Sequence, residues 1–564
     1  MKKPARIIGL IATLLLVGVL FVSFLYYQKN LRPVFVTSAT QSGRHLEEFL
    51  PAASNFFVFV DAQNADQRAK TDELLKGISG ETSQFYINQF ADNLIKDGTL
   101  TSDAATALSK SPRIAIGGVM PVFSLNSKRI AKKADDPQKN PVKDVTALYV
   151  AFEVPNAVEI ANSVNALPDA KQLDPKSSKK KIFAQAVDDV LIFSTDSTEK
   201  LQALTHRKFW ENISLSQTQN FKNYAVHFEK NSLANLYIEL QPAIIVASAS
   251  AAENGFNITS WSTFVDYPDA TKKLVELYSK EHKSLINNVP TNGLLLFAEN
   301  FDLAAQFSFQ PQIGETIAKI TGIDLEKDIG DAVVDFIMQD AGLPIPTVSL
   351  YVDGGASNSS SALSSDGMPV LLKKIDEQLN KLIVFANYSV KTDPSKGPFI
   401  TREKLINTGI SATRVTLHPE NVADGTALPP IVQSLSSALT LTYGTIHRGD
   451  FGPVTFVSTN PFIIENLTSP ALFGVGTESL EKYRAETYKN GGLTYISIDK
   501  LGDSVARFME LLDSTSVTNS QQSGSLRSVA TELRKKLQKF GGLFAVTGTD
   551  GEGLVQKIVL KIVK

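Results

Sequence analysis

Residues 7–27 form an apolar run without a single charged side chain, and this run constrains the chain more than any other feature. As a helix it would be about 31 Å long, which matches a bilayer hydrocarbon core of about 30 Å. Lys2, Lys3 and Arg6 precede it, and positive residues mark the cytoplasmic flank of a membrane helix. We therefore predict a cytoplasmic stub at 1–6, a transmembrane helix at 7–27, and the rest of the chain across the membrane.

A cleaved signal peptide is the alternative for this segment, because it also begins with positive residues followed by an apolar stretch. Its apolar stretch is usually shorter and ends in a small-x-small cleavage site. Here the run ends in Phe24, Leu25, Tyr26 and Tyr27, whose bulk does not suit the peptidase. The two tyrosines instead suit the aromatic belt of a membrane interface. We therefore favour a signal-anchor that is retained.

The overall composition is that of a globular protein, with 43% hydrophobic and 20% charged residues. A net charge of -2 argues against a nucleic-acid-binding protein, which needs clustered Lys and Arg. The chain has no cysteine, which excludes disulfides, thiolate metal sites and cysteine nucleophiles. At 564 residues it should fold as two or more domains.

A recurring order of elements predicts an α+β fold. A short strand-like apolar run is followed by a polar break and then by a stretch with helical i, i+3, i+4 spacing. These pairs are 56–61 with 65–78, 147–152 with 156–167, 348–352 with 369–383, and 493–498 with 501–512. Two stretches rich in small polar residues, 354–367 and 519–525, are expected to be flexible loops.

A second pattern indicates a tandem duplication. Residues 190–196 (VLIFSTD) and 454–460 (VTFVSTN) align without a gap, and each follows a strand and a turn and precedes a short helix. Further matches come in the same order: 235–240 with 493–498, 293–297 with 542–546, and 303–309 with 554–562. Repeated order arises by chance less often than repeated composition. We therefore predict two sheet-plus-helix copies, 45–343 and 344–564, divided near 343–346.

No motif predicts a cofactor or a metal ion. A phosphate-binding loop is missing, and the glycine-rich stretch 548–553 is expected to be a hairpin turn rather than a calcium loop, because it lacks alternating acidic ligands. The histidines lack the spacing of helical metal ligands. They are His45, His206, His227, His282, His418 and His447. We predict no cofactor-binding residue and no metal ligand.

Two Ser-x-x-Lys patterns are the local candidates for a catalytic nucleophile that we weigh. They are Ser197 with Lys200 and Ser479 with Lys482, a spacing that places an amine beside a hydroxyl on one helical turn. Glu199 and Asp196 would favour the charged amine, which cannot act as a base. We therefore predict that Ser197 caps a helix, that Lys200 is solvated, and that no residue is catalytic.

Two basic stretches, 128–143 and 171–181, flank the predicted strand at 147–152. They could contact anionic headgroups, the cell wall or an acidic protein. Interspersed aspartates, such as Asp135 and Asp174, favour two solvated loops instead.

The start MKKPAR, the single anchor, the segment 49–58 (FLPAASNFFV) and the overall length resemble the YfaA-type family of proteobacterial membrane-anchored envelope proteins. The resemblance covers essentially the whole chain. It implies an inner-membrane protein with its C-terminal region in the periplasm. It also implies a genomic association with α2-macroglobulin-like proteins, which trap proteases. The family has no established activity, so it offers no functional residues.

Our leading hypothesis is a non-enzymatic, inner-membrane-anchored periplasmic protein that binds or scaffolds an envelope protein partner, with an α2-macroglobulin-like protein as a candidate. The alternative is a membrane-anchored periplasmic hydrolase acting on peptide or cell-wall substrates. Polar groups that converge in a deep pocket would favour the hydrolase. A broad groove or exposed sheet edges would favour the binding protein.

Overall fold

The computed structural model describes most of the chain beyond residue 44. The described ranges are 45–96, 100–119, 147–167, 181–205, 214–240, 243–264, 268–279, 288–290, 292–302, 315, 319, 331–343, 345–354, 370–407, 409–423, 440–447, 453–468, 476–479, 492–515, 520–549 and 553–563. Within them no helix is both long and apolar enough to cross a membrane. The predicted anchor at 7–27 and the basic stretch at 128–143 lie outside these ranges, as does nearly all of 171–181.

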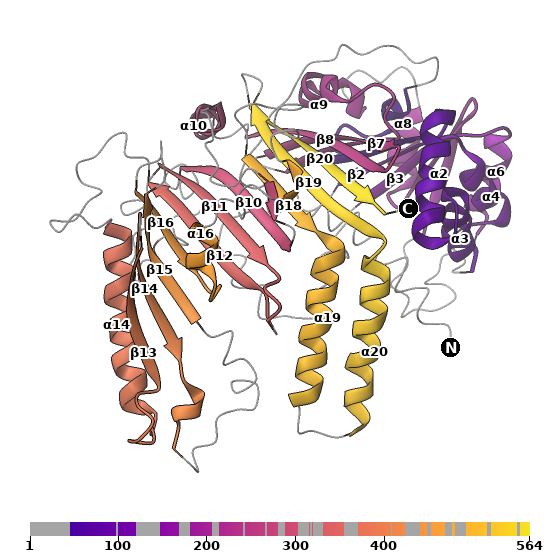
Figure 1. Cartoon of the computed structure of the whole chain (residues 1–564). Coiled ribbons are helices and arrows are strands. Elements are labelled where there is room, and N and C mark those ends of the chain that lie inside the picture. Colours follow the sequence, from indigo (N-terminus) through magenta and orange to yellow (C-terminus); the bar gives the residue numbers. More distant parts are fainter. Residues whose placement is uncertain are drawn as a thin grey trace. The chain divides into compact units, whose positions relative to one another are not determined.

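The predicted α+β class is confirmed, because helices accompany large antiparallel sheets. The chain divides into two compact units, which are coloured from indigo to yellow along the sequence in Figure 1. Unit 1 contains residues 1–271 and 550–559, and unit 2 contains residues 272–549 and 560–563. This division lies about seventy residues before the predicted boundary at 343–346, and it assigns a C-terminal segment to unit 1.

Unit 1 contains an antiparallel sheet in the order β4-β5-β3-β2-β1-β6-β7-β8. Its strands are β1 (Phe56–Asp61), β2 (Arg113–Val119), β3 (Ala147–Glu153), β4 (Phe183–Val187), β5 (Val190–Ser194), β6 (Ala234–Leu240), β7 (Ala243–Ala252) and β8 (Gly255–Phe264). The C-terminal strand β20 (Leu554–Ile562) pairs with β8. The predicted turn at Asp188–Asp189 joins β4 to β5, with Asp188 at a φ of 55°.

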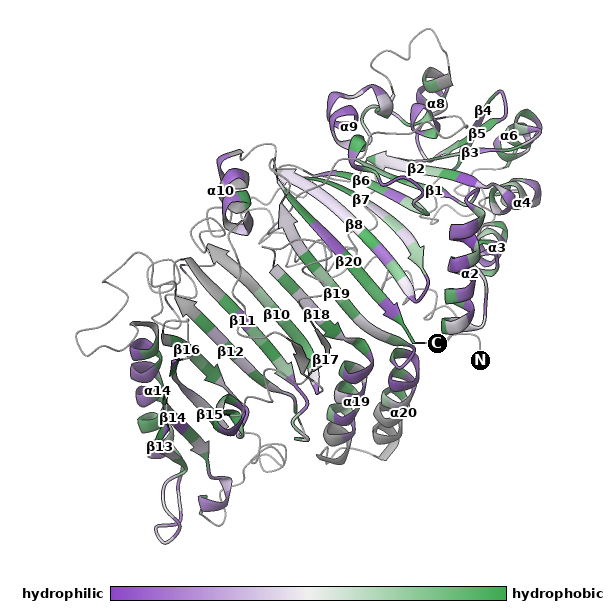
Figure 2. Cartoon of the chain, turned by 45° about the horizontal axis from the view of Figure 1, so that its top comes forward, coloured by the Kyte–Doolittle hydropathy of each residue, from purple (hydrophilic) through white to green (hydrophobic). Residues whose placement is uncertain are grey.

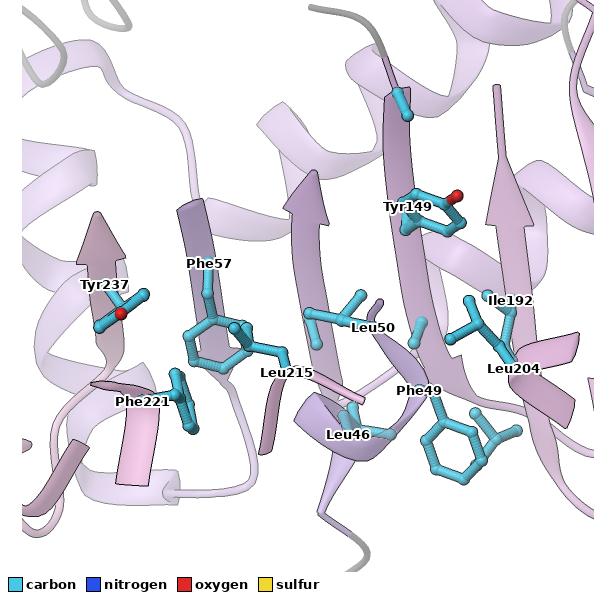
Figure 3. Close-up of a cluster of buried hydrophobic side chains, with 14 of the residues drawn as sticks. Leu46, Phe49, Leu50, Phe57, Tyr149, Ile192, Leu204, Leu215, Phe221 and Tyr237 are labelled. Carbon is cyan, nitrogen blue, oxygen red and sulfur yellow. The ribbon is translucent and has the colours of Figure 1, made fainter. Parts of the chain in front are cut away.

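The sheet of unit 1 is buried on both faces at β3, β4 and β5, where strand residues alternate between two hydrophobic clusters. In β5, Val190 and Ile192 face one cluster while Leu191 and Phe193 face the other, so all four are buried. The first cluster is closed by the short helix η1 (Leu46–Phe49), by α8 (Thr198–Thr205) and by α9 (Gln219–Tyr224), as Figure 3 shows. The second is covered by α4 (Ser102–Lys110) and α6 (Ala157–Asn165).

Helices therefore cover both faces of this part of the sheet. The apolar runs of β3 and β5 have no polar alternation, and such strands require cover on both faces. Two further helices belong to this unit, α2 (Ala65–Ser79) and α3 (Ser83–Lys96). The Asn64 side chain caps the start of α2, and Gly80 ends it at a φ of 83°.

Unit 2 contains an antiparallel sheet in the order β13-β14-β15-β16-β12-β11-β10-β18-β19. Its strands are β10 (Gly293–Asp302), β11 (Asp331–Gln339), β12 (Thr347–Gly354), β13 (Ile400–Asn407), β14 (Ile410–Leu417), β15 (Thr440–His447), β16 (Pro453–Ser458), β18 (Gly492–Ser497) and β19 (Phe540–Thr549). A separate small ladder joins β9 (Asn288–Pro290) to β17 (Gly476–Ser479).

The helices of unit 2 are α14 (Val370–Ser389), α16 (Ile463–Thr468), α19 (Ile498–Thr515) and α20 (Ser520–Leu537). Figure 1 shows α14 alongside β13 and β14, and α19 beside α20. The helix α10 (Pro268–Ser279) spans the division between the units.

Two local predictions fail in unit 2. The stretch 519–525 is not a loop, because α20 begins at Ser520. The predicted stretch 293–297 is too short, because β10 continues to Asp302, paired with β11.

Candidate functional site

Helix α14 is fixed to the sheet of unit 2 along one apolar stripe. Leu372, Ile375, Leu379 and Ile383 recur at helical spacing and pack against a cluster that includes Val415 and Tyr443. This stripe accounts for one face of the helix. It therefore orients the opposite face away from the sheet.

Polar contacts reinforce this attachment. The Tyr443 hydroxyl donates a hydrogen bond to Asp376 Oδ1 at 2.8 Å, and the Arg402 guanidinium donates to both Asp376 and Asn380. Burial, followed by the hydrogen bond to Asp376, raises the pKa of Tyr443 to about 12. The phenol therefore stays a neutral donor at physiological pH. These contacts hold the middle of α14 in one position.

The last two turns of α14 carry large hydrophobic side chains that the sheet leaves exposed. The exposed fractions are 62% for Leu382, 70% for Val384, 69% for Phe385 and 91% for Tyr388. Charged residues border them, and Figure 2 shows green and purple segments alternating along this helix. The α14 surface, as we define it, consists of Glu377, Lys381, Leu382, Val384, Phe385, Tyr388 and Lys391. An aromatic cluster with a polar rim is typical of a protein-binding surface.

The sheet edges are less suited to binding, because side-chain amides occupy them. The Asn387 side chain accepts a hydrogen bond from the Ile400 N–H at 2.8 Å and donates one to its carbonyl at 3.0 Å. The Asn165 side chain bonds both groups of Ala184 at the edge strand β4, at 2.8 and 2.9 Å. The Gln67 side chain does the same at Ala251 of the inner strand β7, which extends past the end of β6 at this point, at 3.3 and 2.6 Å.

In each of these carboxamide clamps, one amide replaces the partner residue that a neighbouring strand would supply. An open edge is a template for strand addition, and proteins commonly block it. The clamps therefore disfavour strand addition at Ala184, Ala251 and Ile400. The α14 surface is therefore better suited to protein binding than these strand positions are.

The predicted role of Ser197 agrees with its geometry. Its Oγ accepts a hydrogen bond from the Lys200 N–H at 3.3 Å, at the start of α8. The Lys200 side chain is 68% exposed, and its amine lies 3.1 Å from Asp196 Oδ2. The amine is therefore solvated and paired with a carboxylate, as predicted, and is not arranged as a base for Ser197.

The second pattern is only partly described, since Ser479 ends β17 and Lys482 lies outside the described residues. His206 and His282 lie outside them as well. Among the described residues, no group of three or more His, Asp or Glu side chains could hold a metal ion. The stretch 548–553, predicted to be a turn, begins within β19, which ends at Thr549, and residues 550–552 lie outside the described ranges.

One hydrogen-bonded series has the order of a nucleophile, a base and an acid. Thr401 Oγ1 lies 2.7 Å from His418 Nε2, and His418 Nδ1 lies 2.8 Å from Glu420 Oε1. Hydrogen bonds from its own backbone N–H and from His418 lower the pKa of Glu420. The carboxylate is 65% exposed, however, so water competes for it. A catalytic site usually has a desolvated base and an enclosing cleft.

Local motif searches missed the α14 surface, although a signal for it exists. Residues 382–385 are Leu, Ile, Val and Phe, and four consecutive apolar residues surround a helix on all sides. A helix that packs on one face of a sheet, as α14 does, can bury only one of those sides.

The chain matches no protein-family model, and comparisons with curated proteins and with solved structures also give no match.

Proposed function

We propose that this chain is a non-enzymatic, inner-membrane-anchored periplasmic protein that binds or scaffolds an envelope protein partner. The α14 surface is the observation that carries this proposal. Four large apolar side chains lie exposed within seven residues of one helix. Covering such a side chain is worth about 1.5–3 kcal/mol, so the cluster favours a partner.

The rigidity of α14 supports the same proposal. A buried apolar stripe, the Tyr443–Asp376–Arg402 contacts and the Asn387 clamp fix the helix before any partner binds. Binding then costs little conformational entropy. The resemblance to envelope proteins makes an α2-macroglobulin-like protein one candidate for the partner, and the predicted anchor would hold the surface in the periplasm.

Affinity purification from detergent-solubilised envelopes tests this function. The double variant Phe385→Asp, Tyr388→Asp should fail to recover at least one protein that the wild type recovers. A second copy of the chain, carrying a different tag, is present in the experiment and counts as one of these proteins. Val158→Asp is the matched control, because Val158 is 59% exposed on α6 of unit 1. Equal recovery of every protein by wild type and double variant would contradict the proposal.

We also propose that the two units arose by tandem duplication. Seven strands follow the same order, β4-β5-β3-β2-β1-β6-β7 in unit 1 and β15-β16-β12-β11-β10-β18-β19 in unit 2. This order pairs 190–194 with 454–458, as the sequence alignment did. In this order β10, which contains 293–297, is the equivalent of β1. The sequence comparison had instead matched 293–297 with 542–546.

A shared pattern of hydrogen bonds gives further support. The Leu148 N–H donates to Thr195 Oγ1 and its carbonyl accepts from the Thr195 N–H, both at 3.0 Å. Val348 and Thr459 repeat this exchange at 2.9 and 2.8 Å. Replacing 190–196 by the sequence of 454–460 should therefore preserve cooperative unfolding, whereas a scrambled order of the same residues should not.

The Thr401–His418–Glu420 series is the one observation that favours a periplasmic hydrolase of peptide or cell-wall substrates instead. In that case a fluorophosphonate probe should label Thr401, and Thr401→Val or His418→Gln should abolish the labelling. On the binding proposal, the wild-type protein remains unlabelled.

A further inference from the structure

We propose that the α14 surface binds the α14 surface of a second copy of this chain, with the two helices antiparallel about a two-fold axis near Val384. This inference rests on the proposed function, because it requires that the α14 surface binds a protein. It adds that this protein is a second copy of the chain. The pairing is isologous, so the same residues of both copies are buried.

The spacing of the outward residues fits a helix–helix contact. Glu377, Lys381, Val384 and Tyr388 recur at intervals of four, three and four residues, which is the repeat of a helical seam. Phe385 lies beside this seam and widens it, whereas Leu382 lies on the flank of the helix away from Val384. The inner stripe from Leu372 to Ile383 lies on the opposite side of the helix and is already occupied by the sheet.

The charges select an antiparallel arrangement. Glu377 precedes Val384 by seven residues, and Lys391 follows it by seven. If Val384 meets Val384 at the axis, Glu377 of each copy lies opposite Lys391 of the other. A parallel pair would instead place Glu377 against Glu377. Lys391 directly follows the last helical hydrogen bond of α14, in which the Val390 N–H donates to the Ala386 carbonyl at 3.0 Å, and its own carbonyl accepts a hydrogen bond from the Ala423 N–H at 3.0 Å.

The same geometry brings Lys381 of one copy near Tyr388 of the other, since these residues lie three before and four after Val384. An ammonium group over a tyrosine ring contributes about 0.5–1 kcal/mol at an exposed site. Apolar residues thus meet at the axis. On both sides of it, Glu377 meets Lys391 of the other copy and Lys381 meets Tyr388.

The size of the surface predicts a weak dimer. A buried aromatic side chain covers about 150–250 Å², so Phe385 and Tyr388 together with Val384 supply on the order of 400 Å² per copy. A standard interface needs about 800 Å² per partner. Confinement of two anchored copies to one membrane raises their effective concentration and compensates for the modest area.

A lipid surface fits these residues less well. Helices that lie on membranes carry Lys and Arg on their polar side, whereas Glu377 lies on the seam itself. Other proteins remain outcomes of the test.

The absence of cysteine makes a cross-linking experiment direct. In detergent-solubilised full-length protein, Val384→Cys should form a covalent dimer under mild oxidation, because residue 384 faces its own counterpart across the axis. Val158→Cys is the matched control and should remain monomeric, since Val158 is a similarly exposed valine on α6. Circular dichroism verifies that both variants fold.

Charge reversal tests the orientation. In sedimentation velocity, Glu377→Lys and Lys391→Glu should each weaken the dimer about tenfold, because each substitution creates two like-charge contacts. The double variant Glu377→Lys, Lys391→Glu should restore wild-type association. Failure of the double variant to recover would overturn the antiparallel pairing.

The remaining outcomes separate this inference from the proposed function. A monomeric wild type that still loses an envelope partner through Phe385→Asp, Tyr388→Asp overturns the dimer and leaves the binding function standing. If the wild type neither self-associates nor loses a partner when the α14 surface is substituted, both the dimer and the binding function are overturned.

Discussion

At the scale of single residues, this protein repeatedly buries a tyrosine against a carboxylate. Tyr149 donates to Asp196 at 2.8 Å, and Tyr237 donates to Glu239 at 2.7 Å. Burial and then the neighbouring carboxylate raise the pKa of both phenols. The phenols therefore remain neutral donors, and they connect hydrophobic clusters to polar groups at the edge of the core without exposing the ring.

Asp196 predicts a specific pH dependence. Burial tends to raise its pKa, but hydrogen bonds from Tyr149, the Ser197 backbone and Lys200 outweigh burial and lower it. A lowered pKa in the folded state gives stability that is present above the unfolded value of 3.8 and is lost as the pH falls through the folded value. Asp196→Asn should therefore be less stable than wild type in urea at pH 7, and the difference should shrink below pH 4.

Ser197→Ala should lower the free energy of unfolding by about 1 kcal/mol through the lost helix cap. Ser197→Asp keeps an acceptor at this position and serves as the control. A serine-directed covalent probe should not label Ser197 in the wild type. Labelling that disappears in Ser197→Ala would contradict the non-catalytic assignment.

Residue-scale prediction succeeded where the contact is local in sequence. Ser197 and Lys200 are three positions apart, so the cap could be inferred from the helix start. Tyr149 and Asp196 are 47 positions apart, and only the pairing of β3 with β5 brings them together. The α14 surface requires knowledge of which face the sheet occupies, which sequence spacing does not supply.

At the scale of elements, the strand–helix pattern located most segments correctly. The predicted strand 56–61 coincides with β1, and 554–562 coincides with β20. The errors have physical causes. Residues 520–525 form the start of α20, which contacts α19, and such tertiary contacts override the weak helix propensity of Ser and Gly. Residues 298–302 remain extended because β11 supplies ladder partners for each of them.

The carboxamide clamps are testable elements. Asn387→Leu leaves the N–H and carbonyl of Ile400 without their amide partner, and should reduce the stability of unit 2 by on the order of 2 kcal/mol. Hydrogen exchange of the Ile400 amide should accelerate. Gln219→Leu is the control, because its bond to Asn223 is an exposed i, i+4 pair worth about 0.2–0.5 kcal/mol. Equal effects of both substitutions would contradict the role of the clamp.

At the scale of the whole molecule, the sequence predicted the α+β class but not the composition of the units. Unit 1 takes its strand β20 from the far end of the chain. A boundary argued from linkers and repeats cannot detect such a strand, because the pairing of β20 with β8 joins residues nearly three hundred positions apart.

This long-range pairing predicts that a C-terminal substitution destabilises the N-terminal unit. Ile558 is 3% exposed in β20, and Ile558→Ala should cost about 2–5 kcal/mol. Trp261 lies in β8 and in the core cluster of unit 1, so its fluorescence reports the loss. Val563→Ala, at a half-exposed position, should leave the transition within about 0.5 kcal/mol of wild type.

The anchor is the prediction on which the cellular location depends. Residues 7–27 carry no charge, and Lys2, Lys3 and Arg6 should hold the N-terminus in the cytoplasm. A reporter that is active only in the periplasm, fused after Lys564, should be active and should sediment with membranes. Leu15→Arg places a charge at the helix centre, which costs about 2.5–3.5 kcal/mol, and should reduce the membrane-inserted fraction. Leu15→Val leaves the run apolar and is the control. A shortened, soluble form of the wild type would show that residues 7–27 are cleaved, and would remove the membrane confinement on which the weak α14 pairing relies.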